Sequence, residues 1–187
     1  MMPNKKLKVG IGLESANDEF REVNINKGFG LKEYEGAMTV LKQCGAQSLT
    51  YVLLKPIGLS EKEAIEDAIS TIDYAFRVGT DEIAIESSFI QPGTAMEKLY
   101  RQGDYTPPWL WSIIEVAKRT HALGFVQLGS FNDEPPPIAT PSNCGKCDHA
   151  LLKAIARYRQ SHSLQDLQNL NCECKDKWQK EVKKNKA

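Results

Sequence analysis

The pattern of apolar and polar residues along the chain predicts β-strands that alternate with α-helices. Apolar runs of strand length end at polar or turn-forming residues, and the segments between them carry apolar residues at helical spacing. Ser60 and Glu63 have capping-box spacing, which opens one helix, and Gly45 is placed to end another. The strands are predicted at residues 7–14, 48–54, 81–87 and 125–128, and the helices at residues 31–44, 60–78, 95–101 and 109–123.

This alternation indicates βαβ units and an α/β fold with a parallel sheet. The strands recur at intervals of roughly 35–44 residues, the rhythm of a (β/α) barrel, but four units make only about half of a full barrel. We therefore expect residues 1–130 to form an open parallel sheet of about four βα units, half of a partial TIM-type barrel. The first strand would lie at an exposed edge, which predicts a homo-oligomer that buries this edge.

The character of the chain changes after residue 128. Residues 132–141 (NDEPPPIATP) are rich in proline and predict no regular structure. Helices follow at about residues 148–160 and from about residue 175. We interpret residues 131–187 as a small helical appendage with too little apolar content for a core of its own, so that a bound metal would supply the missing stability.

Four cysteines in two close pairs distinguish this appendage. Cys144 and Cys147 have C-x-x-C spacing, and Cys172 and Cys174 have the tighter C-x-C spacing. Two thiolates at such spacing can face one ion from a single tight turn, and four of them close a structural zinc site. The spacing also allows iron or an iron–sulfur cluster, so the sequence predicts a metal site and favours zinc without fixing the metal.

Charge and composition narrow the functional classes. The 24 basic and 24 acidic residues balance, so no net charge attracts nucleic acid or a membrane surface. No apolar run approaches the ~20 residues of a membrane span, and no cleavable leader is recognisable, so we expect a cytoplasmic protein with reduced thiols. The lone Cys44 is expected as a core thiol at a helix end. The tail after Cys174 is locally basic, and we expect it to be a solvated helix face or, alternatively, a segment that contacts RNA. Its lysines are Lys175, Lys177, Lys180, Lys183, Lys184 and Lys186.

Polar residues follow the first three predicted strands. Glu14 and Ser15 end the first, Lys55 ends the second, and the third leads through Glu86 to Gln91. The carboxyl ends of parallel strands face the binding site in α/β folds, so these residues form a candidate site. Glu14 can accept hydrogen bonds from ribose hydroxyls or can cap the next helix. Glu14 and Glu86 can also serve as acid and base in an unrelated half-barrel enzyme.

Segments spread over nearly the whole chain have a familiar order. They read GLESAND, NKGF, YVLLKP, LSEKEAIEDAI, IQPGT, LYRQGDYTPPWLWS, NCGKCD and CECK. They resemble the C-terminal portion of the radical S-adenosylmethionine (SAM) family, in particular its archaeosine-biosynthesis members and their uncharacterised bacterial relatives. The segments PPWLWS and NCGKCD are the most specific, whereas the strand end GLES is shared by many radical SAM proteins.

The resemblance implies a partial (β/α)6 barrel that binds SAM. It assigns Glu14, with Ser15 beside it, to the ribose of SAM and Lys27 to the methionine carboxylate. Lys55 and Gln91 would line the remaining cavity. The implied parent activity is radical modification of a nucleoside in tRNA.

The chain departs from the family at the catalytic cluster. The family holds a [4Fe–4S] cluster with a CxxxCxxC motif, and none of the five cysteines here has that spacing. The resemblance therefore implies no catalytic residue in this chain, and the cluster would come from a missing N-terminal barrel half or a partner chain. The competing hypothesis is a non-catalytic scaffold that binds a nucleoside or a partner and keeps a structural zinc knuckle.

Overall fold

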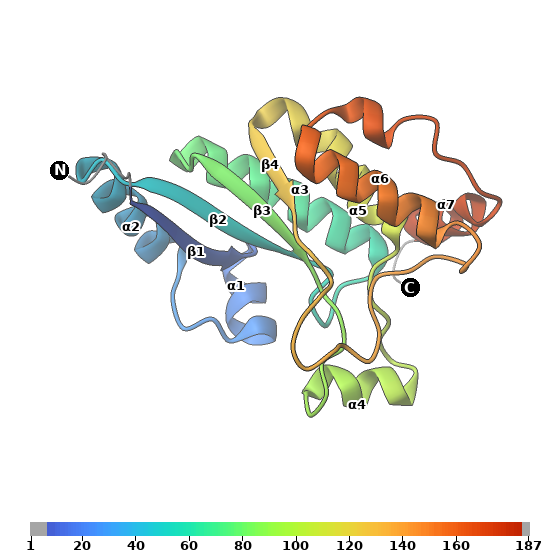
Figure 1. The fold of residues 1–187 in the computed structure, drawn as a ribbon. Helices are drawn as coiled ribbons and strands as arrows, with labels where there is room; N and C mark the ends of the chain where they lie inside the picture. Colours follow the sequence, from blue (N-terminus) through green and yellow to red (C-terminus); the bar gives the residue numbers. More distant parts are fainter. Residues whose placement is uncertain (1–6, 185–187) are drawn as a thin grey trace.

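The computed structural model describes residues 7–184 and contains one four-stranded parallel sheet (Figure 1). The strand order β1-β2-β3-β4 follows the sequence, so each connection crosses to the adjacent strand. The predicted α/β class, the open parallel sheet and its four strands are confirmed. The strands are β1 (Lys8–Glu14), β2 (Gln47–Leu54), β3 (Glu82–Ser87) and β4 (Phe125–Leu128).

The helices begin and end close to the residues that the sequence marks. Ser60 caps the longest helix, because its hydroxyl accepts a hydrogen bond from the backbone N–H of Glu63, and Gly79 ends that helix at a φ of 107°. The helices are α1 (Asp18–Phe20), α2 (Leu31–Gln43), α3 (Glu61–Val78), α4 (Ala95–Gln102), α5 (Leu110–Thr120), α6 (Asp148–Ser161) and α7 (Cys174–Lys183), with single turns η1 (Arg21–Ile25), η2 (His121–Leu123) and η3 (Leu164–Leu167).

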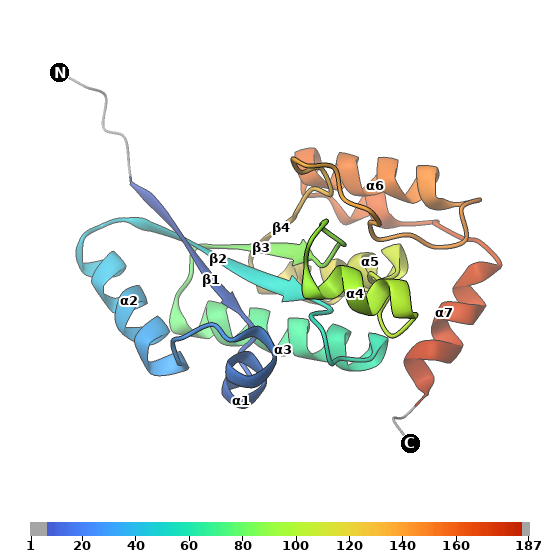
Figure 2. The same cartoon turned by 90° about the horizontal axis from the view of Figure 1, so that it is seen from below.

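The sheet is covered by helices on one face. Along β2, Thr50, Val52 and Leu54 are buried, whereas the residues between them are only partly buried. Successive side chains of a strand point to opposite faces, so the buried set faces the helices. Figure 2 shows α2 and α3 on one side of the strands, and Figure 1 shows β1, β2 and β3 with no helix in front of them. One face of the sheet is therefore left open.

The two edges of the sheet differ in what lies beside them. Helix α6 lies against the β4 edge, where the Arg159 guanidinium donates to the carbonyl of Leu128 at 2.8 Å and to that of Gly129. The Tyr158 hydroxyl donates to the carbonyl of Val126 at 3.4 Å. Within residues 7–184, by contrast, no other strand pairs with the outer side of β1. An uncovered strand edge is a template for pairing with another chain.

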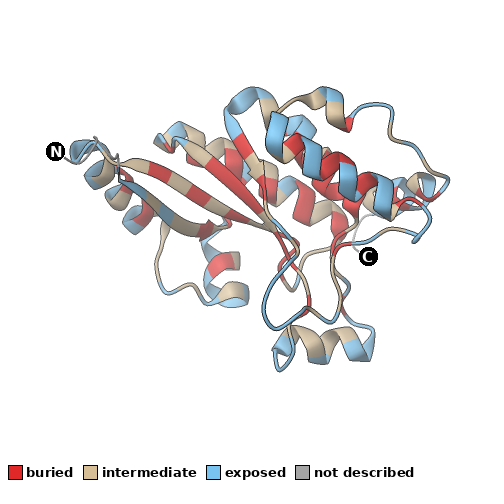
Figure 3. Ribbon diagram, viewed as in Figure 1, coloured by how far each residue is buried: buried red, intermediate tan, exposed pale blue. Residues whose placement is uncertain are grey.

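The appendage shares the core of the sheet and its helices. Leu151 and Ile155 of α6 and Trp178 of α7 belong to the same buried cluster as the strand residues Val52 and Ile85. Buried residues accordingly continue from the sheet into α6 in Figure 3. The helices α6 and α7 are therefore buried against the rest of the chain.

The predictions for the proline-rich segment, Cys44, the lysine-rich tail and membrane spans can also be compared with the structure. Residues 132–141 contain no helix or strand, as expected, and only an isolated bridge joins Ile90 to Ala139. The prediction for Cys44 is wrong: it ends α2, but its side chain is exposed because the helix turns that face to solvent. Lys186 of the lysine-rich tail lies outside the described residues. No described helix has the length and apolar character needed to cross a membrane.

Candidate metal centre and polar clusters at the strand ends

The two cysteine pairs meet in one cluster between α6 and α7. The sulfur of Cys144 lies 3.8 Å from that of Cys147 and 3.7 Å from that of Cys172. The sulfurs of Cys147 and Cys174 are 3.5 Å apart, and all four lie within 4.8 Å of one another. The first pair comes from the turn before α6 and the second from the start of α7, so the cluster ties these two helices together.

Local sequence explains the first half of the cluster. Gly145 has a φ of 81°, a conformation that favours glycine, and this lets the chain turn tightly between the two thiols. The Asp148 carboxylate accepts hydrogen bonds from the backbone N–H of Gly145 at 3.2 Å and of Asn143 at 3.1 Å. The Asn143 side-chain amide lies 3.4 Å from the sulfur of Cys147. The side chains of Asp148 and Asn143 therefore both stabilise the turn between the two cysteines.

Burial and backbone hydrogen bonds shift the pKa values of three of the thiols. Burial raises the pKa of Cys147 and raises that of Cys174 to about 12. The backbone N–H of Cys147 instead helps lower the pKa of Cys144 to about 7. A bound metal ion deprotonates coordinating thiols, so it would offset the desolvation of the two buried thiolates. Cys174 also lies 3.4 Å from the indole nitrogen of Trp111, the kind of outer contact that orients a metal ligand.

The geometry of the cluster fits one tetrahedral ion. Four sulfurs at ~2.3 Å from a central ion lie about 3.8 Å from one another, close to the three separations given above. The ligating sulfurs of an iron–sulfur cluster surround several metal atoms and stand much farther apart. The four cysteines can therefore bind one metal ion. The structure leaves His149 exposed at the start of α6 and outside this group.

Glu14 and Lys27 form the second cluster, on the open face of the sheet. The Lys27 ammonium lies 2.8 Å from the Glu14 carboxylate, and both side chains are partly exposed. Glu14 adopts a φ of 66° where the β1–β2 register shifts between Gly12 and Glu14, which ends the strand. A side chain at Gly12 would collide with both charged groups, so the glycine makes room for the pair.

Ser15 points away from this pair, toward α3. Its hydroxyl donates to the Asp67 carboxylate at 2.7 Å and accepts from the backbone N–H of Asn17 at 3.1 Å. Ser15 is fully buried. Burial also raises the pKa of the Asp67 carboxyl, which the hydrogen bond from Ser15 partly counters. In this arrangement Ser15 anchors the end of β1 to α3.

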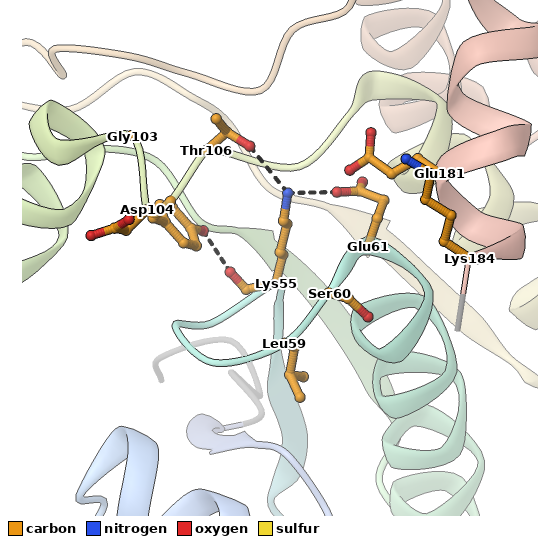
Figure 4. A pocket seen from close by; sticks show the side chains of 10 residues that line it. Lys55, Leu59, Ser60, Glu61, Gly103, Asp104, Thr106, Glu181 and Lys184 are labelled. Atoms are coloured by element: carbon orange, nitrogen blue, oxygen red, sulfur yellow. Dashed lines mark hydrogen bonds and ion pairs between the residues drawn. The ribbon is translucent and has the colours of Figure 1, made fainter. Parts of the chain in front are cut away.

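Lys55 belongs to a third cluster, at the end of β2. It is 5% exposed, and its ammonium lies 2.6 Å from the Glu61 carboxylate and 3.4 Å from the Thr106 hydroxyl. The Tyr105 hydroxyl donates to the Lys55 carbonyl at 2.6 Å. These residues line a cavity of about 340 Å³, shown in Figure 4, to which Glu181 of α7 and Lys184, directly after α7, contribute. The structure therefore places Lys55 with Glu61 in a buried ion pair rather than with Glu14 or Lys27.

The third strand end carries a half-buried carboxyl group. Burial raises the pKa of Glu86, the nearby Arg159 lowers it, and the charge of Glu14 raises it further. Glu86 and Glu14 thus influence each other across the open face of the sheet. Gln91 lies farther along, and its side-chain amide donates to Asp133 at 2.9 Å. Of the residues predicted to bind SAM, all within the described part of the chain, only Glu14 and Lys27 have side chains in contact with each other.

Sequence reasoning missed the residues that organise the Lys55 cluster. Glu61 accepts hydrogen bonds from the backbone N–H of Trp109 at 2.9 Å and from the Ser112 hydroxyl at 2.5 Å. An acidic residue in the first turn of a helix is commonplace, because it complements the helix dipole, so Glu61 gave no signal of a buried role. Trp109 and Trp111 both lie at the junction of α5 with α7.

Known proteins provide an independent comparison. Archaeosine synthase subunit beta of Methanosarcina acetivorans is 35% identical over 185 residues, which cover 96% of this chain and 52% of that protein. The protein of the same name from Thermococcus kodakarensis is 38% identical over 188 residues, covering 96% of this chain and 56% of that protein. The chain thus spans about half the length of the curated relatives it matches. No protein-family model matches it.

A solved structure supports the fold. Elp3 of Methanocaldococcus infernus, with an N-terminal deletion, superposes with a TM-score of 0.60 at 16% identity. The match covers 83% of this chain and 36% of that chain. At this level of identity the similarity concerns the backbone arrangement alone.

Proposed function

We propose that this chain acts as the second half of a radical SAM barrel in a protein that modifies a tRNA nucleoside. The observation that carries the proposal is the open face of the sheet, with the Glu14–Lys27 pair at the end of its uncovered edge strand. The sequence resemblance and the names of the relatives support the same assignment. Residues 1–130 would be the barrel half and residues 131–187 a metal-bearing appendage.

Glu14 and Lys27 are the residues we assign to SAM. A carboxylate on the open face can accept hydrogen bonds from the two ribose hydroxyls, and an ammonium beside it can pair with the methionine carboxylate. In the absence of a ligand the two groups neutralise each other at 2.8 Å. Binding would exchange this partly exposed ion pair for contacts with the ligand, at a modest cost, because exposed pairs contribute only about 0–1 kcal/mol.

Ser15, Lys55 and Gln91 receive other roles in this proposal. Ser15 supports the end of β1 through Asp67, and Gln91 joins the loop after β3 to Asp133. Lys55 lines the cavity beside Glu61 and would meet a polar group of the substrate rather than SAM. Glu86 faces the same open side as Glu14 and completes the polar lining.

This chain lacks the cysteine motif that would bind the catalytic [4Fe–4S] cluster. Reductive cleavage of SAM requires an electron from a [4Fe–4S] cluster. The five cysteines lack the CxxxCxxC spacing, and four of them have the separations of a single tetrahedral ion. We assign that ion as zinc, because four thiolates close a structural zinc site, and we give it a structural role. No reaction step is assigned to residues of this chain.

The [4Fe–4S] cluster would come from a partner chain that pairs with β1. The β4 edge is occupied by α6, whereas the β1 edge has no strand beside it within residues 7–184. A partner strand there would extend the parallel sheet toward a barrel and cover its open face. The relatives' name, subunit beta, also favours a further subunit in the assembly. A second copy of this chain is the alternative occupant, and sedimentation of the isolated chain distinguishes the two.

The direct test combines this chain with a half-barrel that carries CxxxCxxC, under anaerobic and reducing conditions. We expect the mixture to form 5′-deoxyadenosine from SAM faster than either half alone. Glu14→Gln should lower that rate about tenfold, which corresponds to ~1.4 kcal/mol, whereas Glu19→Gln on exposed α1 should leave it unchanged.

The competing function is a non-catalytic scaffold. The absence of cluster ligands in this chain is the observation that favours it. Association of the two halves without any increase in 5′-deoxyadenosine would support the scaffold and contradict the proposed half-barrel. A failure of the two halves to associate would contradict the proposed half-barrel, and a further failure of the chain to bind a nucleoside would contradict the scaffold as well.

A further inference from the structure

All three tryptophans of the chain lie where α7 packs against the start of α5. Trp111, at the start of α5, donates from its indole nitrogen to the sulfur of Cys174 at 3.4 Å. Trp178, on α7, is 6% exposed and belongs to the main core. The cysteine cluster therefore borders directly on the junction that holds the three tryptophans.

A chain of polar contacts runs from this junction to the cavity. The indole nitrogen of Trp178 donates to the Ser112 hydroxyl at 2.8 Å, and that hydroxyl donates to the Glu61 carboxylate at 2.5 Å. The other oxygen of Glu61 pairs with the Lys55 ammonium at 2.6 Å. Ser112, Glu61 and Lys55 are all buried. Because buried polar groups depend on one another for hydrogen bonds, displacement of Trp178 would leave this network incomplete.

Helix α7 also forms one wall of the cavity. Glu181 and Lys184 lie opposite Lys55 in Figure 4. The Trp109 indole nitrogen holds Glu181 in place with a hydrogen bond of 3.0 Å. The wall therefore exists only while α7 rests against the start of α5.

The helix also packs against α3, but few of its side chains are buried. It has ten residues, and only Cys174 and Trp178 are buried within it. An isolated helix of this length is marginally stable in water, so its position depends on what anchors its ends. Cys172 and Cys174 stand at its N-terminus, where a metal bound together with Cys144 and Cys147 would fix it to the turn before α6.

We propose that metal binding at the four cysteines controls the cavity around Lys55. With metal bound, α7 is fixed against α5, the network from Trp178 to Lys55 is complete, and Glu181 and Lys184 close the cavity. Without metal, α7 detaches, the cavity loses this wall, and the Lys55–Glu61 pair is exposed to water. The inference rests on the metal site proposed above and adds that the site sets the state of the cavity.

The test removes the metal from the full chain with a chelator and follows two signals. Tryptophan emission should shift to longer wavelength, because all three indoles report on the junction. Acetylation of Lys55 by an N-hydroxysuccinimide acetate ester, read by peptide mass spectrometry, should accelerate at least fivefold. The exposed Lys32 on α2 is the internal control and should react at an unchanged rate. Added zinc should reverse both changes.

Trp178→Phe tests the coupling without touching a cysteine. It removes the N–H that reaches Ser112, so we expect faster acetylation of Lys55 while one metal ion per chain is retained. Lys177→Ala, at an exposed position of the same helix, is the matched control and should resemble the unmodified chain.

The possible failures are distinguishable. A purified chain that binds no metal would contradict the proposed metal site. A chain that binds metal, loses it to the chelator and keeps both its emission and its Lys55 reactivity would contradict the coupling alone. Loss of amide-exchange protection throughout β2 and β3 on chelation would also contradict it, because the change would then be global unfolding.

Discussion

The buried ion pair between Lys55 and Glu61 offers the sharpest mutational prediction. Lys55 and Glu61 are 5% and 2% exposed, and their charged groups lie 2.6 Å apart. Glu61→Gln keeps an oxygen for the hydrogen bonds from Trp109 and Ser112 but leaves the ammonium buried without a counter-charge. Removal of one partner of such a pair costs about 3–5 kcal/mol, a large share of the roughly 5–15 kcal/mol that stabilises a typical domain.

The free energy of unfolding can be measured by urea denaturation followed by tryptophan emission. Glu66→Gln on the same helix is the matched control. Its ion pair with Arg119, at 2.6 Å, is about half exposed, so its loss should cost less than about 1 kcal/mol. The double variant Lys55→Met with Glu61→Gln should recover much of the loss, because no unpaired charge remains. Equal effects of Glu61→Gln and Glu66→Gln, or additive effects of the two cavity substitutions, would refute the reasoning.

Three further predictions concern the other clusters. Burial raises the pKa of Asp67 in the native chain, so this carboxyl lowers stability as pH rises above its unfolded pKa. Asp67→Asn should therefore reduce the loss of stability between about pH 4 and about pH 7, and an unchanged pH dependence would exclude this cause. Gly12→Ala should displace Glu14, so that SAM cleavage by the assembled barrel falls about tenfold, while the unfolding free energy changes by less than about 1 kcal/mol. A Gly12→Ala chain that supports full SAM cleavage would contradict the placement of Glu14 at the SAM site. Cys147→Ser should abolish binding of the metal ion, whereas Cys44→Ser at an exposed position should retain it, as metal analysis of both variants would reveal.

The sheet and its helices could be predicted because local signals and global packing agree. The capping pair Ser60 and Glu63 predicted the start of α3, and Gly45 predicted the end of α2, each within a residue or two. The clustered spacing of the cysteines likewise indicated a metal site before any geometry was known, and the sulfur separations fit a single ion. Such signals are contained in a few neighbouring residues.

The partners of polar side chains could not be predicted in the same way. Lys55 follows its strand as expected, but a φ of 61° and the cluster around Glu61 place it in a buried ion pair. Ser15 directly follows Glu14 but turns to Asp67 on α3, 52 residues away in the sequence. The choice of partner depends on how distant helices pack, and the local sequence does not encode it.

Metal analysis and X-ray absorption on the anaerobically purified chain test the central claim most directly. The central claim is that the metal centre of this chain is structural and that the catalytic cluster comes from elsewhere. It predicts about one zinc ion per chain with four sulfur neighbours at ~2.3 Å, and no iron. Stoichiometric iron with iron–iron scattering would contradict it, because the four cysteines would then hold a cluster themselves.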